Sequence, residues 1–131
     1  MSAAAPGAGD PRWRRTAAGR VQDLRAGDLE RFVAAAMHLW PLAIALIGPF
    51  APLLPLVLWL CFRRTGPLVD DHGREVMNSQ CTMLVLVLVP CAGWLALVAW
   101  LPAWIVSIVR GAVAAGGSEL FRYPALLRPI G

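Results

Sequence analysis

The sequence predicts an all-α integral membrane protein built from two helical hairpins, with four membrane segments in total. Two long blocks, 32–62 and 76–109, contain no Asp, Glu, Lys or Arg. Each block exceeds the roughly 20 apolar residues that one helical crossing requires. Hydrophobic residues make up 58% of the chain and charged residues 15%, against about 45–50% and about 25% in soluble domains. A soluble fold of this size would have too little polar surface to cover such a core.

The positions of the charges predict the membrane topology of the chain. All twelve cationic residues are arginines, and they lie outside the two blocks or at their edges. Arginine-bearing segments next to membrane helices are usually held in the cytoplasm. Because the segments before, between and after the blocks all carry arginine, each block is expected to turn back. We therefore expect a multi-pass inner-membrane protein with both termini cytoplasmic, whose partner is the lipid bilayer and not a nucleic acid.

The ends of the chain are expected to lie outside the membrane domain. Residues 1–27 are rich in Ala, Gly, Pro and Arg and have few large apolar side chains. Such a segment buries too little apolar surface to offset the entropy lost on ordering, which predicts a disordered tail. The four-helix membrane domain is expected over 28–117, starting with Asp28 as the helix N-cap. Residues 118–131 then form a cytoplasmic C-terminal tail.

The first block is expected to form two unequal helices. The pattern predicts a helix over 28–48, kinked where Pro41 removes a backbone donor. Gly48-Pro49 predicts a turn, and a second helix follows over 52–62. At 1.5 Å per residue this second helix is shorter than a full bilayer. It either stands nearly upright, thins the membrane locally, or forms half of a re-entrant hairpin.

The second block is expected to form the other pair of helices. Asp70-Asp71 suit the start of a helix over 71–99, and Trp100-Leu101-Pro102 suit an outer turn because proline is well tolerated in a first helical turn. The last helix is then expected over 102–115, and Gly116-Gly117 ends it.

The polar residues between and beside the blocks form the candidate site. His38 lies deep in the first block, where a polar group normally faces protein or water. The first and third helices both start on the cytoplasmic side, so His38 is expected near His72, Asn78 or Gln80. Two interpretations stay open: a polar, proton-sensitive contact, and a hydrogen-bonded histidine that only fixes helix packing. The full set of site residues is His38, Asp70, Asp71, His72, Arg74, Glu75, Asn78 and Gln80.

The same residues predict no catalytic, cofactor or metal centre. His72 and Glu75 alone supply too few ligands, and no His-Glu-x-x-His pattern is present. The three cysteines form no Cys-x-x-Cys pair. The expectation is that the protein is not an enzyme.

Three motifs resemble a family of small bacterial membrane proteins of unassigned function. They are the opening His38-Leu39 with Gly48-Pro49, the central segment 72–80 (HGREVMNSQ) and the closing segment 119–124 (ELFRYP). The family is distantly related to the twenty-kilodalton subunit of the chloroplast inner-envelope protein translocon (Tic). The resemblance implies a four-helix membrane domain without known catalytic residues. It adds a closing motif to the site, namely Glu119, Arg122, Tyr123 and Pro124.

The sequence leaves three hypotheses about function. The first is a non-enzymatic scaffold or subunit of a membrane or translocation complex, whose partner is a second copy or another membrane subunit. The second is a small oligomeric channel or transporter that uses His38 and the proline-broken hairpin. The third, an intramembrane enzyme or metal protein, rests on His38, His72, Asp70, Asp71 and Glu75.

Overall fold

The computed structural model describes residues 10–130, and this part of the chain is mostly helical. Two short strands come first, β1 (Trp13–Arg15) and β2 (Val21–Asp23). The helices follow in the order α1 (Asp28–His38), α2 (Ile44–Ile47), α3 (Leu53–Phe62), α4 (Pro67–Leu88) and α5 (Ala92–Gly116). The all-helical prediction therefore holds for residues 28–117, while the strands before them were not expected.

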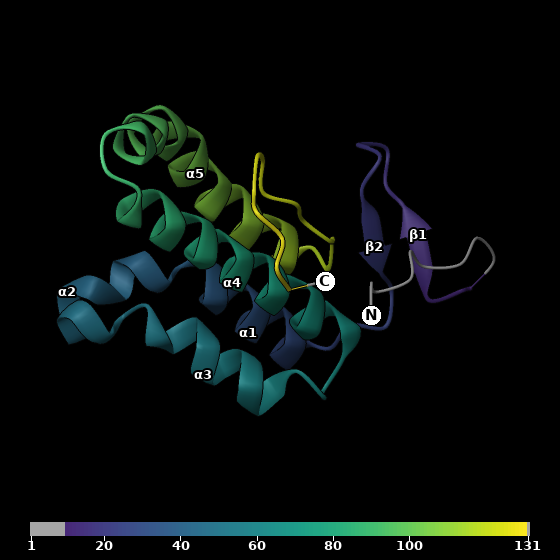
Figure 1. Ribbon diagram of the computed structural model, residues 1–131. Helices are drawn as coiled ribbons and strands as arrows, with labels where there is room; N and C mark the ends of the chain where they lie inside the picture. The colour runs from purple at the N-terminus through teal and green to yellow at the C-terminus, as the bar shows by residue number, and fades with distance from the viewer. Residues whose placement is uncertain (1–9, 131) are drawn as a thin grey trace.

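Helix α1 lies at the centre of the packing. It contacts α3, α4 and α5, and α4 also contacts α3 and α5. Its side chains Val33, Ala34 and Met37 are buried at 3% exposure or less. The long helices lie along one another, with α2 and the α4–α5 turn at one end (Figure 1). The two strands and the last residues of the chain lie towards the other end, which we call the polar cap.

The N-terminal segment is not the disordered tail that its composition predicted, at least from residue 10 onward. Strands β1 and β2 pair antiparallel, with Trp13 opposite Asp23. The Asp23 carboxylate is buried and accepts two hydrogen bonds from Arg12, at 2.9 and 2.7 Å. Gln22 forms an isolated bridge with Glu119, far along the chain. These polar contacts supply the stabilisation that apolar burial could not; residues 1–9 of the predicted tail lie outside the described part.

The first apolar block breaks earlier than predicted. Helix α1 ends at His38, ten residues before the expected end, and the chain continues as short helical turns around Pro41 and Pro49. Segments Asp28–His38 and Trp40–Phe50 meet at 66°. Each proline lacks the N–H of a regular helix, so a continuous helix is not maintained here. Helix α3 begins at Leu53, one residue after the expected position.

The turn in the second block lies about ten residues before its predicted position. Helix α4 already starts at Pro67 and ends at Leu88, and α5 then runs from Ala92 to Gly116 with Pro102 inside it. Pro90 ends the helix instead, because the residue before a proline is disfavoured in the helical conformation. Accordingly Val89 is extended, with φ −95° and ψ 103°. Trp100 and Trp104 are consequently buried in the core.

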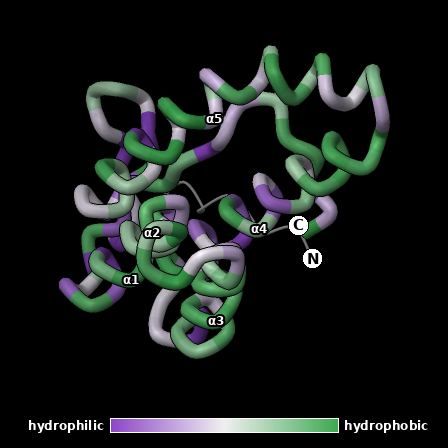
Figure 2. The backbone as a smooth tube through the Cα atoms, turned by 90° about the vertical axis from the view of Figure 1, so that its left-hand side faces the viewer, coloured by the Kyte–Doolittle hydropathy of each residue, from purple (hydrophilic) through white to green (hydrophobic). Residues whose placement is uncertain are grey.

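One described helix, α5, is long and apolar enough to cross a membrane by itself. The bent pair formed by α1 and the segment Trp40–Phe50 passes the same test only when taken together, and α3 is apolar but short. Figure 2 shows long hydrophobic stretches along α2, α3 and α5. Large apolar side chains are widely exposed, among them Leu46 at 87% and Leu95 at 75%. Exposure on this scale marks a surface that contacts lipid or protein.

Candidate functional site

A chain of buried hydrogen bonds joins α1, α4 and the C-terminal segment 118–130, which we call the strap. His38 on α1 bonds through Nδ1 to the Tyr123 hydroxyl at 2.7 Å and through Nε2 to His72 Nδ1 at 2.8 Å. His72 Nε2 lies 2.9 Å from the backbone oxygen of Glu119. Both histidines have no exposed surface, and Tyr123 is 3% exposed. The expected approach of His38 to His72 is therefore present, and we call these groups the histidine network.

With both imidazoles neutral, the network has one consistent arrangement of protons. A backbone oxygen only accepts, so His72 must donate from Nε2 to Glu119 and accept at Nδ1. His38 then donates from Nε2 to His72 and accepts at Nδ1, which leaves the Tyr123 hydroxyl as donor to His38. Both imidazoles are neutral in this arrangement. Every ring nitrogen has a partner, so the network satisfies its own polar groups without a ligand.

A glycine on α5 makes room for the network. A Cβ atom at Gly111 would lie 2.5 Å from His38 Nδ1, closer than any side chain tolerates. The absence of a side chain lets α5 pass directly over the His38 ring. The rings of Phe121 and Tyr123 complete the enclosure, with Tyr123 stacked on His38 at 5.5 Å between centroids.

One face of α4 holds the strap along its length. Residues spaced three or four apart on a helix share a face, and five polar residues of α4 on or beside this face bond to the strap. They are Asp71, His72, Glu75, Asn78 and Thr82, whose strap partners are Arg122, Glu119, Tyr123, Ile130 and Leu127 respectively. The central motif and the closing motif of the sequence are thus two halves of one interface. The strap packs against α4 and is not the free tail that the sequence predicted.

The ionic part of this interface lies at the cap. Arg122 donates to both carboxylate oxygens of Asp71 at 2.6 Å, and this hydrogen-bonded ion pair raises the pKa of the guanidinium. Buried Glu75 accepts from Arg128 and from the Tyr123 backbone N–H, each at 3.3 Å. Burial, with a smaller contribution from the negative charge of Glu75, raises the pKa of the Tyr123 hydroxyl. Tyr123 is therefore held as a neutral donor.

Asn78 closes the far end of the strap. Its amide nitrogen donates to the backbone oxygen of Ile130 at 2.9 Å, and its amide oxygen accepts from the Ile130 N–H at 3.0 Å. This pair of hydrogen bonds resembles the pairing between neighbouring β-strands and fixes the position of the strap along α4. Asn78 is 2% exposed, so losing it would leave both backbone groups of Ile130 without their partner.

The other predicted site residues of α4 face α3 and do not join the histidine network. Asp70 accepts from the Trp59 indole at 2.9 Å and from Arg74 at 2.9 Å. Gln80 donates to the backbone oxygen of Pro52 at 3.0 Å. Asp70 and Asp71, expected as helix caps, lie inside α4 because Pro67 already starts the helix. They act as side-chain partners for neighbouring segments.

The closing motif also ties the strap to the strands and to α5. The Glu119 carboxylate accepts from Arg20 at 2.8 Å, and the backbone oxygen of Pro124 accepts from the Trp100 indole at 3.2 Å. Sequence reasoning did not identify Arg20, Gly111 or Thr82 as site residues. A three-to-four spacing from Asn78 was a usable signal for Thr82, whereas Arg20 and Gly111 meet the site only through tertiary packing.

The histidine network, the polar face of α4 and the strap together hold the helices and the C-terminal segment in contact, and we call this arrangement the clasp. Among residues 10–130 no group of three or more His, Cys, Asp or Glu side chains is placed to hold a metal ion. The histidines, Tyr123 and the carboxylates of Asp71 and Glu75 are all engaged with other protein groups. The arrangement holds the helices and the strap together through hydrogen bonds and ion pairs, and it places Arg122 and Arg128 at the cap.

Residues 29–130 match the magnetosome magnetite crystal formation protein family. The chain belongs to this family. The matched region begins at the second residue of α1 and ends at Ile130, so it contains α1 from Leu29 onward, all the later helices and the strap. No curated protein and no solved structure matches the chain.

The family assignment replaces the more distant relationship that the motifs had indicated. The comparisons give a magnetosome family over the region that resembled the membrane proteins of unassigned function. They give no support for kinship with the translocon subunit. Membership in the family and the apolar helix α5 together support membrane association of a mostly helical chain.

Proposed function

We propose that this protein is a non-enzymatic membrane subunit that takes part in forming magnetite crystals at the magnetosome membrane. The observation that carries the proposal is that the family match covers the helices and the clasp as one unit. The strap contacts that occupy the buried side chains of α4 stabilise a rigid cap and leave no obvious reactive group among them. A rigid cap on a membrane-embedded body suits a protein that acts by contact with other components.

In the proposed arrangement the apolar end lies in the bilayer and the cap in the cytoplasm. Exposed apolar side chains lie on α2, on α3 and around the α4–α5 turn, whereas the ion pairs of Asp23, Asp71 and Glu75 belong to the cap. Four segments enter the membrane in this proposal, and α3 penetrates without fully crossing. The partner is a second copy of the chain or another membrane subunit.

The channel hypothesis has less support than the scaffold hypothesis. It depends on His38 as a group that exchanges with a substrate or proton path. Both ring nitrogens of His38 are hydrogen-bonded inside the protein, and Gly111 packs over the ring. These contacts support the interpretation that His38 fixes helix packing.

In-membrane crosslinking tests the proposed scaffold role. A photoreactive side chain placed at Arg14, exposed on β1, samples the cap, and one placed at Leu95 samples the apolar end. We expect the Arg14 probe to capture the same chain or one other membrane subunit reproducibly, as identified by mass spectrometry. Capture of lipid alone from both positions would contradict a scaffold.

A cellular readout tests the link to crystals. In a magnetosome-forming bacterium lacking this chain, we expect the wild type to restore crystal size as seen by electron microscopy. An Asn78→Leu variant lacks the two hydrogen bonds to Ile130 at the end of the strap. It is expected to restore crystal size poorly at equal protein level. Unchanged crystals on removing the chain would contradict the proposed role.

A further inference from the structure

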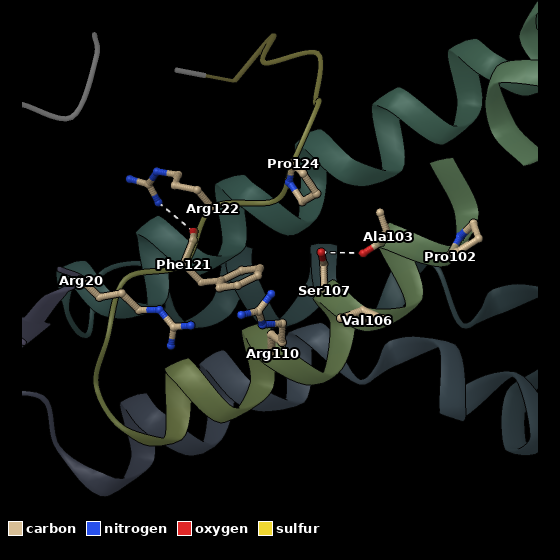
Figure 3. A pocket seen from close by; sticks show the side chains of 9 residues that line it. All are labelled: Arg20, Pro102, Ala103, Val106, Ser107, Arg110, Phe121, Arg122 and Pro124. Atoms are coloured by element: carbon tan, nitrogen blue, oxygen red, sulfur yellow. Dashed lines mark hydrogen bonds between the residues drawn. The ribbon is translucent and has the colours of Figure 1, made fainter. Parts of the chain in front are cut away.

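A pocket of about 550 Å³ lies between α5 and the strap, and it is not part of the histidine network. Figure 3 shows it from close by. Its lining residues are Arg20, Pro102, Ala103, Val106, Ser107, Arg110, Phe121, Arg122 and Pro124. The lining includes three arginines and no Asp or Glu. The pocket therefore favours an anion.

Arg110 is the one arginine lining this pocket whose side chain has no partner in the described part of the chain. It makes no hydrogen bond or ion pair with any residue between 10 and 130, and it is exposed. Arg122 is different: its guanidinium is held by Asp71 and Glu75. In Figure 3 Arg110 and Arg20 extend beside the Phe121 ring, while the Arg122 guanidinium points away from them.

Arg20 supplies a second cation in the pocket, and some of its N–H donors are not used by its ion pair. Its ion pair with Glu119 uses one terminal nitrogen, at 2.8 Å. A guanidinium has five N–H donors in a planar fork that matches the oxygens of a phosphate. Arg20 and Arg110 line the same pocket from different segments, so an anion between them would be bound from two sides.

The remaining lining suits an acyl chain. Pro102 and Val106 precede Arg110 by eight and four residues, which places all three on one face of α5. The Ser107 hydroxyl donates to the Ala103 backbone oxygen at 2.7 Å, so it adds no free donor. The pocket is thus cationic at one end and apolar along the helix. Arg110 also sits between exposed Val106, Val109 and Val113, a costly place for a charge without a counter-ion.

We propose that this pocket binds the phosphate group of an anionic phospholipid, with Arg110 and Arg20 on the phosphate and an acyl chain along Val106 and Pro102. The inference rests on the membrane location proposed above. It is independent of any role in crystal formation. Free phosphate shares the headgroup chemistry but would make no use of the apolar half of the pocket.

Native mass spectrometry of the full chain in a neutral detergent tests this site. The probes are phosphatidylglycerol, phosphatidylcholine and inorganic phosphate, each added to the wild type and to variants. We expect one retained phosphatidylglycerol per chain and about a tenfold loss of retention in Arg110→Gln, because a charge-assisted hydrogen bond is removed. Arg110→Lys should retain most of the binding. Val106→Trp, which fills the apolar half without changing the charge, should also reduce it.

The control is Arg64→Gln, which removes an exposed arginine beyond the end of α3 and outside the pocket. An equal loss in Arg64→Gln would show nonspecific attraction and overturn the proposal. Arg110-dependent binding of phosphate that matches phosphatidylglycerol in strength would assign the site to a free anion and overturn the lipid. Equal retention of phosphatidylcholine would also overturn it. Membrane insertion is measured separately by thiol labelling, so failure here is distinguishable from failure of the membrane location.

Discussion

At the scale of single residues, the histidine network shows how polar groups are tolerated inside an apolar body. As neutral rings, His38 and His72 are buried with a partner for every ring nitrogen. A buried polar group with no partner costs about 1–3 kcal/mol. The network is therefore stabilising only while it is complete, and each member depends on its neighbours.

Removing the Tyr123 hydroxyl tests this dependence. In Tyr123→Phe, His38 Nδ1 loses its donor while the ring packing stays, so we expect the free energy of unfolding to fall by about 1–3 kcal/mol. Thermal or denaturant unfolding in detergent measures the change. The control is Thr65→Val, which removes an exposed hydroxyl bonded only to the Phe62 backbone oxygen and should change stability little. Equal effects of the two substitutions would argue against the network.

The raised pKa of Tyr123 gives a pH dependence with a definite sign. Burial keeps the folded hydroxyl protonated above the pH at which an unfolded tyrosine, with a pKa of about 10, ionises. The unfolded state then loses its proton first, so stability is complete below pH about 10 and falls by about 1.4 kcal/mol per pH unit above it. Tyr123 is the only tyrosine in the chain, so ultraviolet absorbance reports its ionisation directly. Identical titration of folded and denatured protein would refute this account.

At the scale of the elements, close packing of α5 on α1 depends on one missing side chain. In Gly111→Ala the new methyl group meets the buried His38 ring, which has no free space to move into. We expect a loss of about 1–3 kcal/mol from overpacking, in spite of the better helix propensity of alanine. Gly116→Ala on the same helix is a matched control, because nothing lies within 4 Å of its Cβ position. That control should be neutral or slightly stabilising in the same unfolding measurement.

The two polar faces of α4 have separable roles. Asn78→Leu should release the end of the strap, because Ile130 loses both of its hydrogen bonds. We expect amide hydrogen exchange over 124–130 to become at least tenfold faster, corresponding to about 1.4 kcal/mol. Gln80→Leu changes the same type of side chain on the face towards α3 and should leave the strap protected. Faster exchange of the strap in both variants would mean that α4 as a whole is destabilised.

At the scale of the whole molecule, thiols at two positions report the proposed orientation. Native Cys91 lies exposed at the α4–α5 turn, and Thr65 lies exposed in the α3–α4 connection. In variants with Cys91 as the single thiol, we expect an impermeant reagent to label intact spheroplasts. Thr65→Cys in a cysteine-free background, placed in the α3–α4 connection, should label only after lysis. Labelling of the connection from outside would invalidate the arrangement with both termini inside.

The sequence predicted the helical, apolar character of the protein more accurately than the positions of its turns. Charge-free blocks predicted helices over most of 28–117, and Gly116-Gly117 predicted the end of α5. The turn was placed at Pro102 instead of Pro90 because both prolines suit a helix end, and only the packing of Trp104 against Trp40 and Trp100 selects between them. The strands were missed because their stability comes from Arg12–Asp23 and Arg20–Glu119, pairs that join distant positions.

The sequence by itself determined a helical, apolar chain and the two polar motifs, because these depend on local pattern and residue type. Only the tertiary structure decided that the motifs form one clasp, that the histidines satisfy each other, and that Arg110 stays unpaired. The physical reason is that hydrogen bonds and ion pairs depend on distances between residues far apart in the chain. Residue spacing places His72, Glu75 and Asn78 on one helix face, but it does not determine which segment meets that face.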